Sequence, residues 1–111
     1  MSLGTHLKAL RDARGLGLRK TAKAVDISPA YLSRLENDQV APPSEKVLLS
    51  LAKELGENPD VLLAIAGRVS QRLQDIIVRR PQLFAQVIEF LADQPDHAVL
   101  RVVREVRDGK W

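Results

Sequence analysis

The stretch from residue 27 to residue 38 constrains the fold more than any other, because it combines a helix start with a one-sided apolar pattern. Ser28 can accept a hydrogen bond from a free amide of the first turn, and Pro29 stands where a helix needs no N–H. We therefore predict a helix that begins at Pro29, with Leu32 and Leu35 on its buried face. The residues that point elsewhere are Pro29, Ala30, Ser33 and Arg34. That outward face is slim enough to enter a DNA major groove, although an ordinary capped surface helix would show the same pattern.

Composition favours helices and a small domain. Of the 111 residues, 45% are hydrophobic but only 4% are aromatic, which suits helices rich in Leu, Val and Ala better than β-sheets. A chain of this length forms one small domain, alone or with an appendage. It contains no cysteine, so disulfides and thiolate metal sites are excluded, and no apolar run approaches the roughly 20 residues of a membrane span. We therefore expect an all-α protein of the cytoplasm with no membrane segment.

Charge is distributed unevenly along the chain, although the formal net charge is only +3. Residues 8–34 contain seven basic and two acidic side chains, a local balance of +5. Residues 36–60 contain two basic and six acidic side chains, a balance of −4. Such a distribution can turn one face toward phosphates and keep the other away, and a solvated surface of mixed charge is the alternative.

Two helices are expected before the Pro29 helix. Leu3, Leu7 and Leu10 have helical spacing, and Gly15 is a natural stop for that first helix. A second, shorter helix is expected over residues 18–25, followed by a turn of two residues. A helix, a short turn and another helix in so compact a span form a helix-turn-helix arrangement.

Residues 3–66 resemble the lambda-repressor/Cro-like (Xre-type) helix-turn-helix family of transcriptional regulators. The residues that carry the resemblance are Gly15–Leu16, Ala22, Ile27–Ser28, Tyr31–Asn37 and Leu51–Gly56. The resemblance implies an all-α, five-helix domain that binds double-stranded DNA without a cofactor, and a repressor by family habit. It also implies a structural ion pair between Arg11 on the first helix and Glu36 on the helix that begins at Pro29, which would read the DNA bases.

Two positions and one loop depart from the family pattern. Asp26 stands at the turn position that glycine usually holds, and aspartate tolerates a left-handed backbone less readily. Leu18 stands where relatives often carry a glutamine that braces phosphate and base. The loop of residues 39–43 has no Lys or Arg, which places one of the family's phosphate contacts in doubt.

Two further capped helices complete the expected domain. Ser44 can cap a fourth helix, which Gly56 would end, and Asn58 can cap a fifth. Apolar residues at helical spacing form an inner stripe in both. We therefore assign the five-helix DNA-binding domain to residues 1–67.

The remaining residues, 68–111, are predicted to form a short C-terminal helical extension. One helix is expected over residues 69–77, a second from Pro81, and a third from Pro95 to near Gly109. Their apolar stripes are too large to remain exposed in a free tail, so we favour a homodimer, with packing against the chain's own core as the alternative. Candidate dimerisation residues are Val99, Val102, Val103, Val106 and Trp111.

Side-chain chemistry suggests which residues would read bases. Arg34 can donate two hydrogen bonds to O6 and N7 of guanine, and Ser33 can donate or accept. Pro29 and Ala30 can contact a thymine methyl group. The resulting set of base-reading candidates is Pro29, Ala30, Ser33 and Arg34.

A second set of residues is expected to contact phosphates. The resemblance implies this role for Ser28, Tyr31 and the backbone of Asn37, which would set the register without specifying sequence. Arg19 and Lys20 could add positive charge from the second helix, and plain solvation is an even alternative for Lys20. A two-fold dimer would bind a near-palindromic operator.

Other functions have less support. His6 and His97 lie far apart without ligand spacing, no catalytic motif can be placed, and we expect neither an enzyme, a metal site nor a cofactor. The main alternative is a protein-binding adaptor on the same scaffold, which the uncharged loop and modest net charge favour. The extension could also be acted on by a regulatory protein partner, such as the metalloprotease found alongside some repressors of this type.

Overall fold

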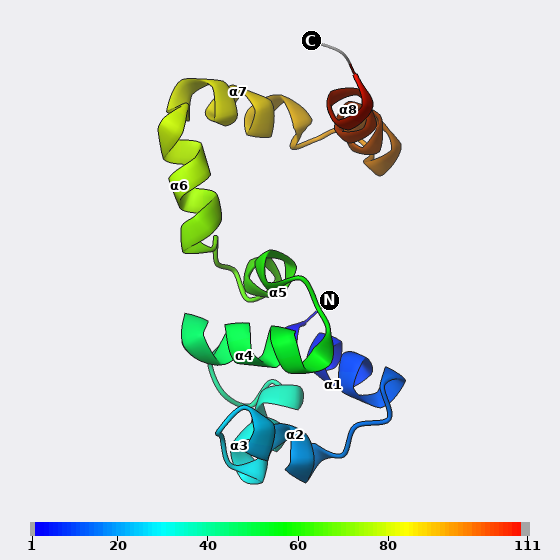
Figure 1. The fold of residues 1–111 in the computed structure, drawn as a ribbon, viewed down its shortest axis with the longest axis vertical. Coiled ribbons are helices and arrows are strands. Elements are labelled where there is room, and N and C mark those ends of the chain that lie inside the picture. Colours follow the sequence, from blue (N-terminus) through cyan, green and yellow to red (C-terminus); the bar gives the residue numbers. More distant parts are fainter. Residues whose placement is uncertain (1, 110–111) are drawn as a thin grey trace. The chain divides into compact units, whose positions relative to one another are not determined.

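The computed structural model describes residues 2–109, and these residues form helices and loops with no β-strand (Figure 1). The helices are α1 (Leu3–Ala13), α2 (Leu18–Ala24), α3 (Pro29–Glu36), α4 (Glu45–Leu55), α5 (Pro59–Ile65), α6 (Gln71–Arg79), α7 (Pro81–Leu91) and α8 (Asp96–Asp108). The predicted all-α class is confirmed. The described residues contain eight helices, which are the five of the N-terminal part and then α6, α7 and α8 where three helices were expected for the extension.

The chain divides into two compact units, residues 1–73 and residues 74–111. The boundary predicted after residue 67 lies before this division. The hydroxyl of Ser70 donates to a carboxylate oxygen of Asp60 in α5 at 2.6 Å, so the start of α6 is bonded to the first unit. The domain boundary of the sequence analysis stays a prediction.

The helices begin and end where local chemistry directs them. The predicted caps Ser28, Ser44 and Asn58 each accept a hydrogen bond from an amide of the following turn. At Ser28 the acceptor lies 3.0 Å from the amide nitrogen of Tyr31. At the other end of α4, Gly56 adopts a left-handed φ of 70°, which a residue without Cβ adopts without strain.

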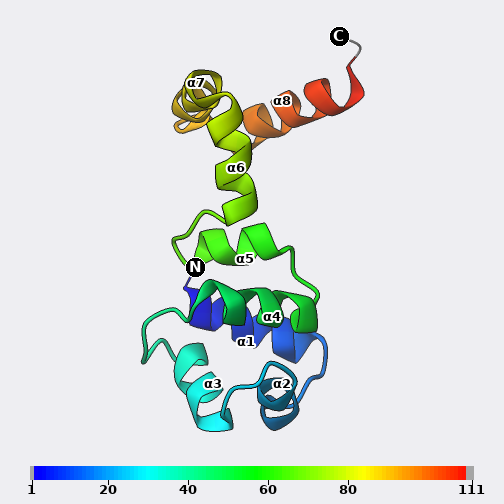
Figure 2. The same cartoon turned by 60° about the vertical axis from the view of Figure 1, so that its left-hand side comes forward.

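The core of the first unit is built from leucines at helical spacing. Its most deeply buried large side chains are Leu7, Leu32, Leu48, Leu51, Leu55, Leu62 and Leu63. Each such side chain contributes about 1.5–3 kcal/mol by leaving water. Helix α1 packs against α3 and α4, α2 packs against α3, and α4 packs against α5 (Figure 2).

The turn between α2 and α3 has the left-handed residue that the sequence analysis placed there. Asp26 has φ 59°, and the amide of Ile27 donates to the carbonyl of Ala22 at 2.9 Å. Ala22 is fully buried, so its small side chain allows α2 and α3 to lie close together. A two-helix unit of fixed geometry follows from these three residues.

The second unit contains α7 and α8. Helix α7 begins at Pro81 as predicted, whereas Pro95 is the extended N-cap of α8, which begins one residue later. Of the dimerisation candidates, Val99 is half-buried, Val102, Val103 and Val106 are exposed, and Trp111 lies outside the described residues. No helix in residues 2–109 has the length and apolarity to cross a membrane.

Candidate nucleic-acid interface

Helix α3 has one buried face and one exposed face. Leu32 and Leu35 are at most 2% exposed and hold the helix against the core. The residues of the exposed face are Ser28, Pro29, Ala30 and Arg34, with Ser33 and Tyr31 half-buried beside them. The packed leucines therefore present the base-reading candidates of the sequence analysis outward as one short, continuous surface. Whether these residues contact bases stays a prediction.

The buried end of α3 carries an ion pair with α1. Arg11 donates from Nε and Nη2 to the two carboxylate oxygens of Glu36, at 2.8 and 2.9 Å, and from Nη1 to the carbonyl of Leu16 at 2.8 Å. These bonds to Glu36 raise the pKa of Arg11. Only 5% of the Glu36 side chain is exposed, so the ion pair is a buried link between α1 and α3.

A second link between α3 and α1 was not foreseen in the sequence. The carboxylate of Asp38 accepts a hydrogen bond of 3.0 Å from the amide of Gly4, in the first turn of α1. Asp38 has φ 56°, a left-handed conformation that is uncommon outside glycine. The only local signal was an aspartate two residues after a helix end, and the partner lies 34 residues away.

The phosphate candidates differ in which donors they retain. The hydroxyl oxygen of Ser28 accepts from the amide of Tyr31, which leaves its own O–H to donate. The backbone N–H of Asn37 already donates to the carbonyl of Ser33 at 3.1 Å, and its side-chain amide donates to the same oxygen at 2.8 Å. Because a carboxamide has a second N–H, the side chain is the freer donor of Asn37.

Positive charge lies on α2, beside α3. Arg19, Lys20 and Lys23 are exposed there, and Asp26 is exposed in the following turn. The uncharged loop of residues 39–43 adds no cation. Among the described residues there is no group of three or more side chains that could hold a metal ion, and His6 instead bonds Glu57 at 2.8 Å. The candidate surface is therefore a helix pair with modest positive charge.

These features together define a helix-turn-helix protein. Residues 2–64 match the family described as "Helix-turn-helix domain". The chain is 39% identical over 95 residues to the HTH-type transcriptional regulator DdrOP3 of Deinococcus deserti, covering 78% of this chain and 72% of that protein. It is 33% identical over 111 residues to the HTH-type transcriptional regulator PrpR of Mycobacterium tuberculosis, covering 94% of this chain but only 23% of PrpR. The chain belongs to the helix-turn-helix family of transcriptional regulators.

Solved structures agree with this family. The clp gene regulator ClgR from Corynebacterium glutamicum is 29% identical with a TM-score of 0.52, over 83% of this chain and 92% of that chain. The SinR protein/SinI protein complex gives a TM-score of 0.54 at 16% identity, over 95% of this chain and 94% of that chain, a likeness of fold alone. The family resemblance read from the sequence is confirmed.

Proposed function

We propose that this chain binds double-stranded DNA in a sequence-specific manner and represses transcription, with α3 inserted into the major groove. The observation that carries the proposal is that α3 has two faces: Leu32 and Leu35 are buried in the core, and the slim opposite face is exposed. Arg34 extends from that face without an ion pair to any described residue. An unpaired guanidinium on a helix of this kind is suited to donate two hydrogen bonds to guanine.

The remaining residues of the surface divide into two roles under this proposal. Ser33, Pro29 and Ala30 would contact base edges beside Arg34, the last two through thymine methyl groups. The phosphate contacts would come from Arg19, Lys20, Ser28, Tyr31 and Asn37. These contacts supply affinity and register but no sequence information. No cofactor is needed for either role, and the protein would act in the cytoplasm.

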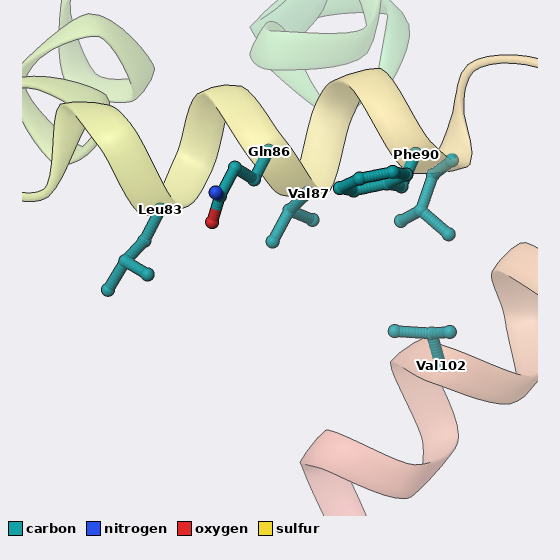
Figure 3. A pocket seen from close by; sticks show the side chains of 6 residues that line it. Leu83, Gln86, Val87, Phe90 and Val102 are labelled. Atoms are coloured by element: carbon teal, nitrogen blue, oxygen red, sulfur yellow. The ribbon is translucent and has the colours of Figure 1, made fainter.

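A homodimer would place two copies of α3 about 34 Å apart on a near-palindromic operator. Support comes from an open apolar groove in the second unit, about 530 Å³ in volume and lined by Leu83, Gln86, Val87, Phe90, Leu91 and Val102. Figure 3 shows the side chains of α7 directed toward the same space as Val102 of α8. Leu83, Val87 and Phe90 are exposed together along α7, and a contiguous exposed apolar patch on a soluble protein often marks an interaction site. We propose that a second copy of the chain covers this groove.

The dimer is tested by a charge on the groove. Phe90→Asp should shift the protein from dimer to monomer in sedimentation equilibrium, because a carboxylate in a desolvated interface is costly. The matched control is Leu49→Asp on α4, another exposed apolar residue, which should leave the dimer intact. A Phe90→Asp protein that remains dimeric would exclude the groove as the interface.

The second candidate function is a protein-binding adaptor. The same exposed apolar groove favours it, because a partner protein could cover that surface instead of a second copy. A regulatory partner acting on the extension, such as a metalloprotease, would fit the same observation. In this case the exposed face of α3 would not bind DNA.

Selection from a random duplex library distinguishes the two functions. The selected duplex and a scrambled duplex are then titrated at several salt concentrations. An enriched inverted repeat that binds far more tightly than the scrambled duplex establishes the specific dimeric regulator. If neither duplex binds at low salt, DNA binding is rejected and the adaptor function takes its place.

A further inference from the structure

The C-terminal end of α3 is joined to α1 at two separate points. Glu36 bonds Arg11 near the end of α1, and Asp38 bonds the amide of Gly4 in its first turn. Gly4 and Arg11 are seven residues apart on the same helix, which is about 10 Å along its axis. The reading helix is therefore tied across two turns of α1.

The absence of a side chain at Gly4 makes the contact with Asp38 possible. A Cβ atom there would lie 2.6 Å from the carbonyl oxygen of Glu36 and 2.6 Å from the carboxylate of Asp38, and would also collide with the carbonyl of Leu35. The first turn of α1 consequently rests directly on the last carbonyl groups of α3.

The backbone at Asp38 ends α3 in a defined way. Its amide donates to the carbonyl of Leu35 at 3.2 Å, and the next amide, of Gln39, donates to the carbonyl of Arg34 at 2.9 Å. Glycine is the usual residue at this left-handed position, and aspartate is less favourable there. Asp38 accepts a hydrogen bond from the amide of Gly4, which a glycine at position 38 could not do. The negative charge of the Asp38 carboxylate is also favourable at the N-terminal end of α1.

We propose that Asp38 is a positioning residue that sets the angle at which α3 enters the major groove, an inference that rests on the proposed DNA binding. Leu32 and Leu35 hold the body of α3 against the core, and the Glu36 ion pair joins its C-terminal end to α1. The bond from Gly4 to Asp38 adds a second attachment at this end, seven residues away along α1, and restricts the small tilts of α3 that would change the angle of Arg34 to the bases. Hydrogen bonds to base edges depend on such geometry, whereas attraction to phosphates does so far less.

The test uses the two aspartates of this chain that have a left-handed backbone. Asp38→Gly keeps that conformation available and removes the carboxylate. Asp26→Gly is the matched control, because Asp26 has φ 59° and its carboxylate accepts no hydrogen bond within residues 2–109. Asp38→Asn restores an acceptor for the Gly4 amide. Each protein is titrated with the selected operator and with a scrambled duplex, and its thermal midpoint is measured.

We expect Asp38→Gly to lower the ratio of operator to scrambled affinity by about tenfold or more, a small part of the usual specificity ratio. The Asp38→Asn and Asp26→Gly proteins should retain the ratio within about twofold. If the Asp38→Gly protein has a lower thermal midpoint but keeps the ratio of operator to scrambled affinity, Asp38 contributes only to stability, and the proposal is overturned. If the Asp38→Gly protein is unfolded at the assay temperature, the Asp38→Asn protein is the test instead. A folded Asp38→Asn protein that no longer binds the operator more tightly than the scrambled duplex also overturns the proposal. Failure of the wild-type protein to bind either duplex rejects the proposed function itself.

Discussion

Removing the guanidinium of Arg11 should destabilise the folded chain by about 3–5 kcal/mol, because it leaves a buried carboxylate without its partner. Two charge-assisted hydrogen bonds to Glu36, of 2.8 and 2.9 Å, would be lost together with the bond of 2.8 Å to the carbonyl of Leu16, each worth about 1.5–3 kcal/mol. Only 13% of the Arg11 side chain and 5% of the Glu36 side chain are exposed, so water replaces these bonds poorly. The substitution Arg11→Met keeps the apolar part of the side chain and removes its charge.

Urea unfolding followed by circular dichroism measures the effect. The double variant Arg11→Met/Glu36→Met should recover most of the lost free energy of unfolding, because neither charge then remains buried. Arg107→Met is the control, since Arg107 and Asp108 form an ion pair with both side chains 65% exposed, and no measurable change is expected. A loss below about 1 kcal/mol for Arg11→Met would mean that the buried pair behaves as a surface ion pair, which would refute the reasoning.

Three further predictions concern DNA binding and pH. Arg34→Ala should cost about 1–3 kcal/mol on the operator and relax the preference at one base pair, and an unchanged preference in a repeated library selection would remove Arg34 as a base reader. Arg19→Ala should weaken binding to all duplexes alike and reduce the salt slope by about 0.9, so a loss confined to the operator would contradict its phosphate role. Hydrogen bonds from His6 and from the backbone amide of Asn58 lower the pKa of Glu57. The ionised carboxylate therefore contributes its full share of folding stability above its ordinary pKa of 4.5, and this share is lost as the pH falls through the lowered pKa. Glu57→Gln should therefore differ from wild type in thermal midpoint at neutral pH, and the difference should shrink as the pH falls below 4.5, whereas a constant difference would show that this ionisation is not involved.

Local patterns were sufficient to predict most of the fold. Capping hydroxyls and amides need only the next turn, which is why the starts of α3, α4 and α5 could be predicted. Leucines at helical spacing identify the buried face of a helix without knowledge of its neighbours. The Arg11–Glu36 pair came from the family resemblance, because nothing local joins residues 25 positions apart.

What the sequence could not predict depends on contacts between distant segments. The bond between Asp38 and Gly4 requires that the start of α1 meet the end of α3, which no spacing reveals. The bond between Ser70 and Asp60, which ties the start of α6 to α5, is likewise a tertiary contact. For α7 the apolar stripe was foreseen, but periodicity shows only that a helix has such a face and not what covers it.

The weak positive charge of the α3 surface and the apolar groove of the second unit have a common consequence. The loop of residues 39–43 has no cation, so a single copy would make fewer phosphate contacts than one with a basic loop, and phosphate contacts supply a large share of the affinity for DNA. In the proposed dimer, a second copy linked through α7 and α8 would make the second half-site an intramolecular partner, which can raise affinity by about 10²–10⁴ without any new contact. Occupancy of the operator would then depend more steeply on the monomer–dimer equilibrium than on the charge of each copy. Under this proposal, a partner that displaced the second copy from the groove would weaken DNA binding without touching α3.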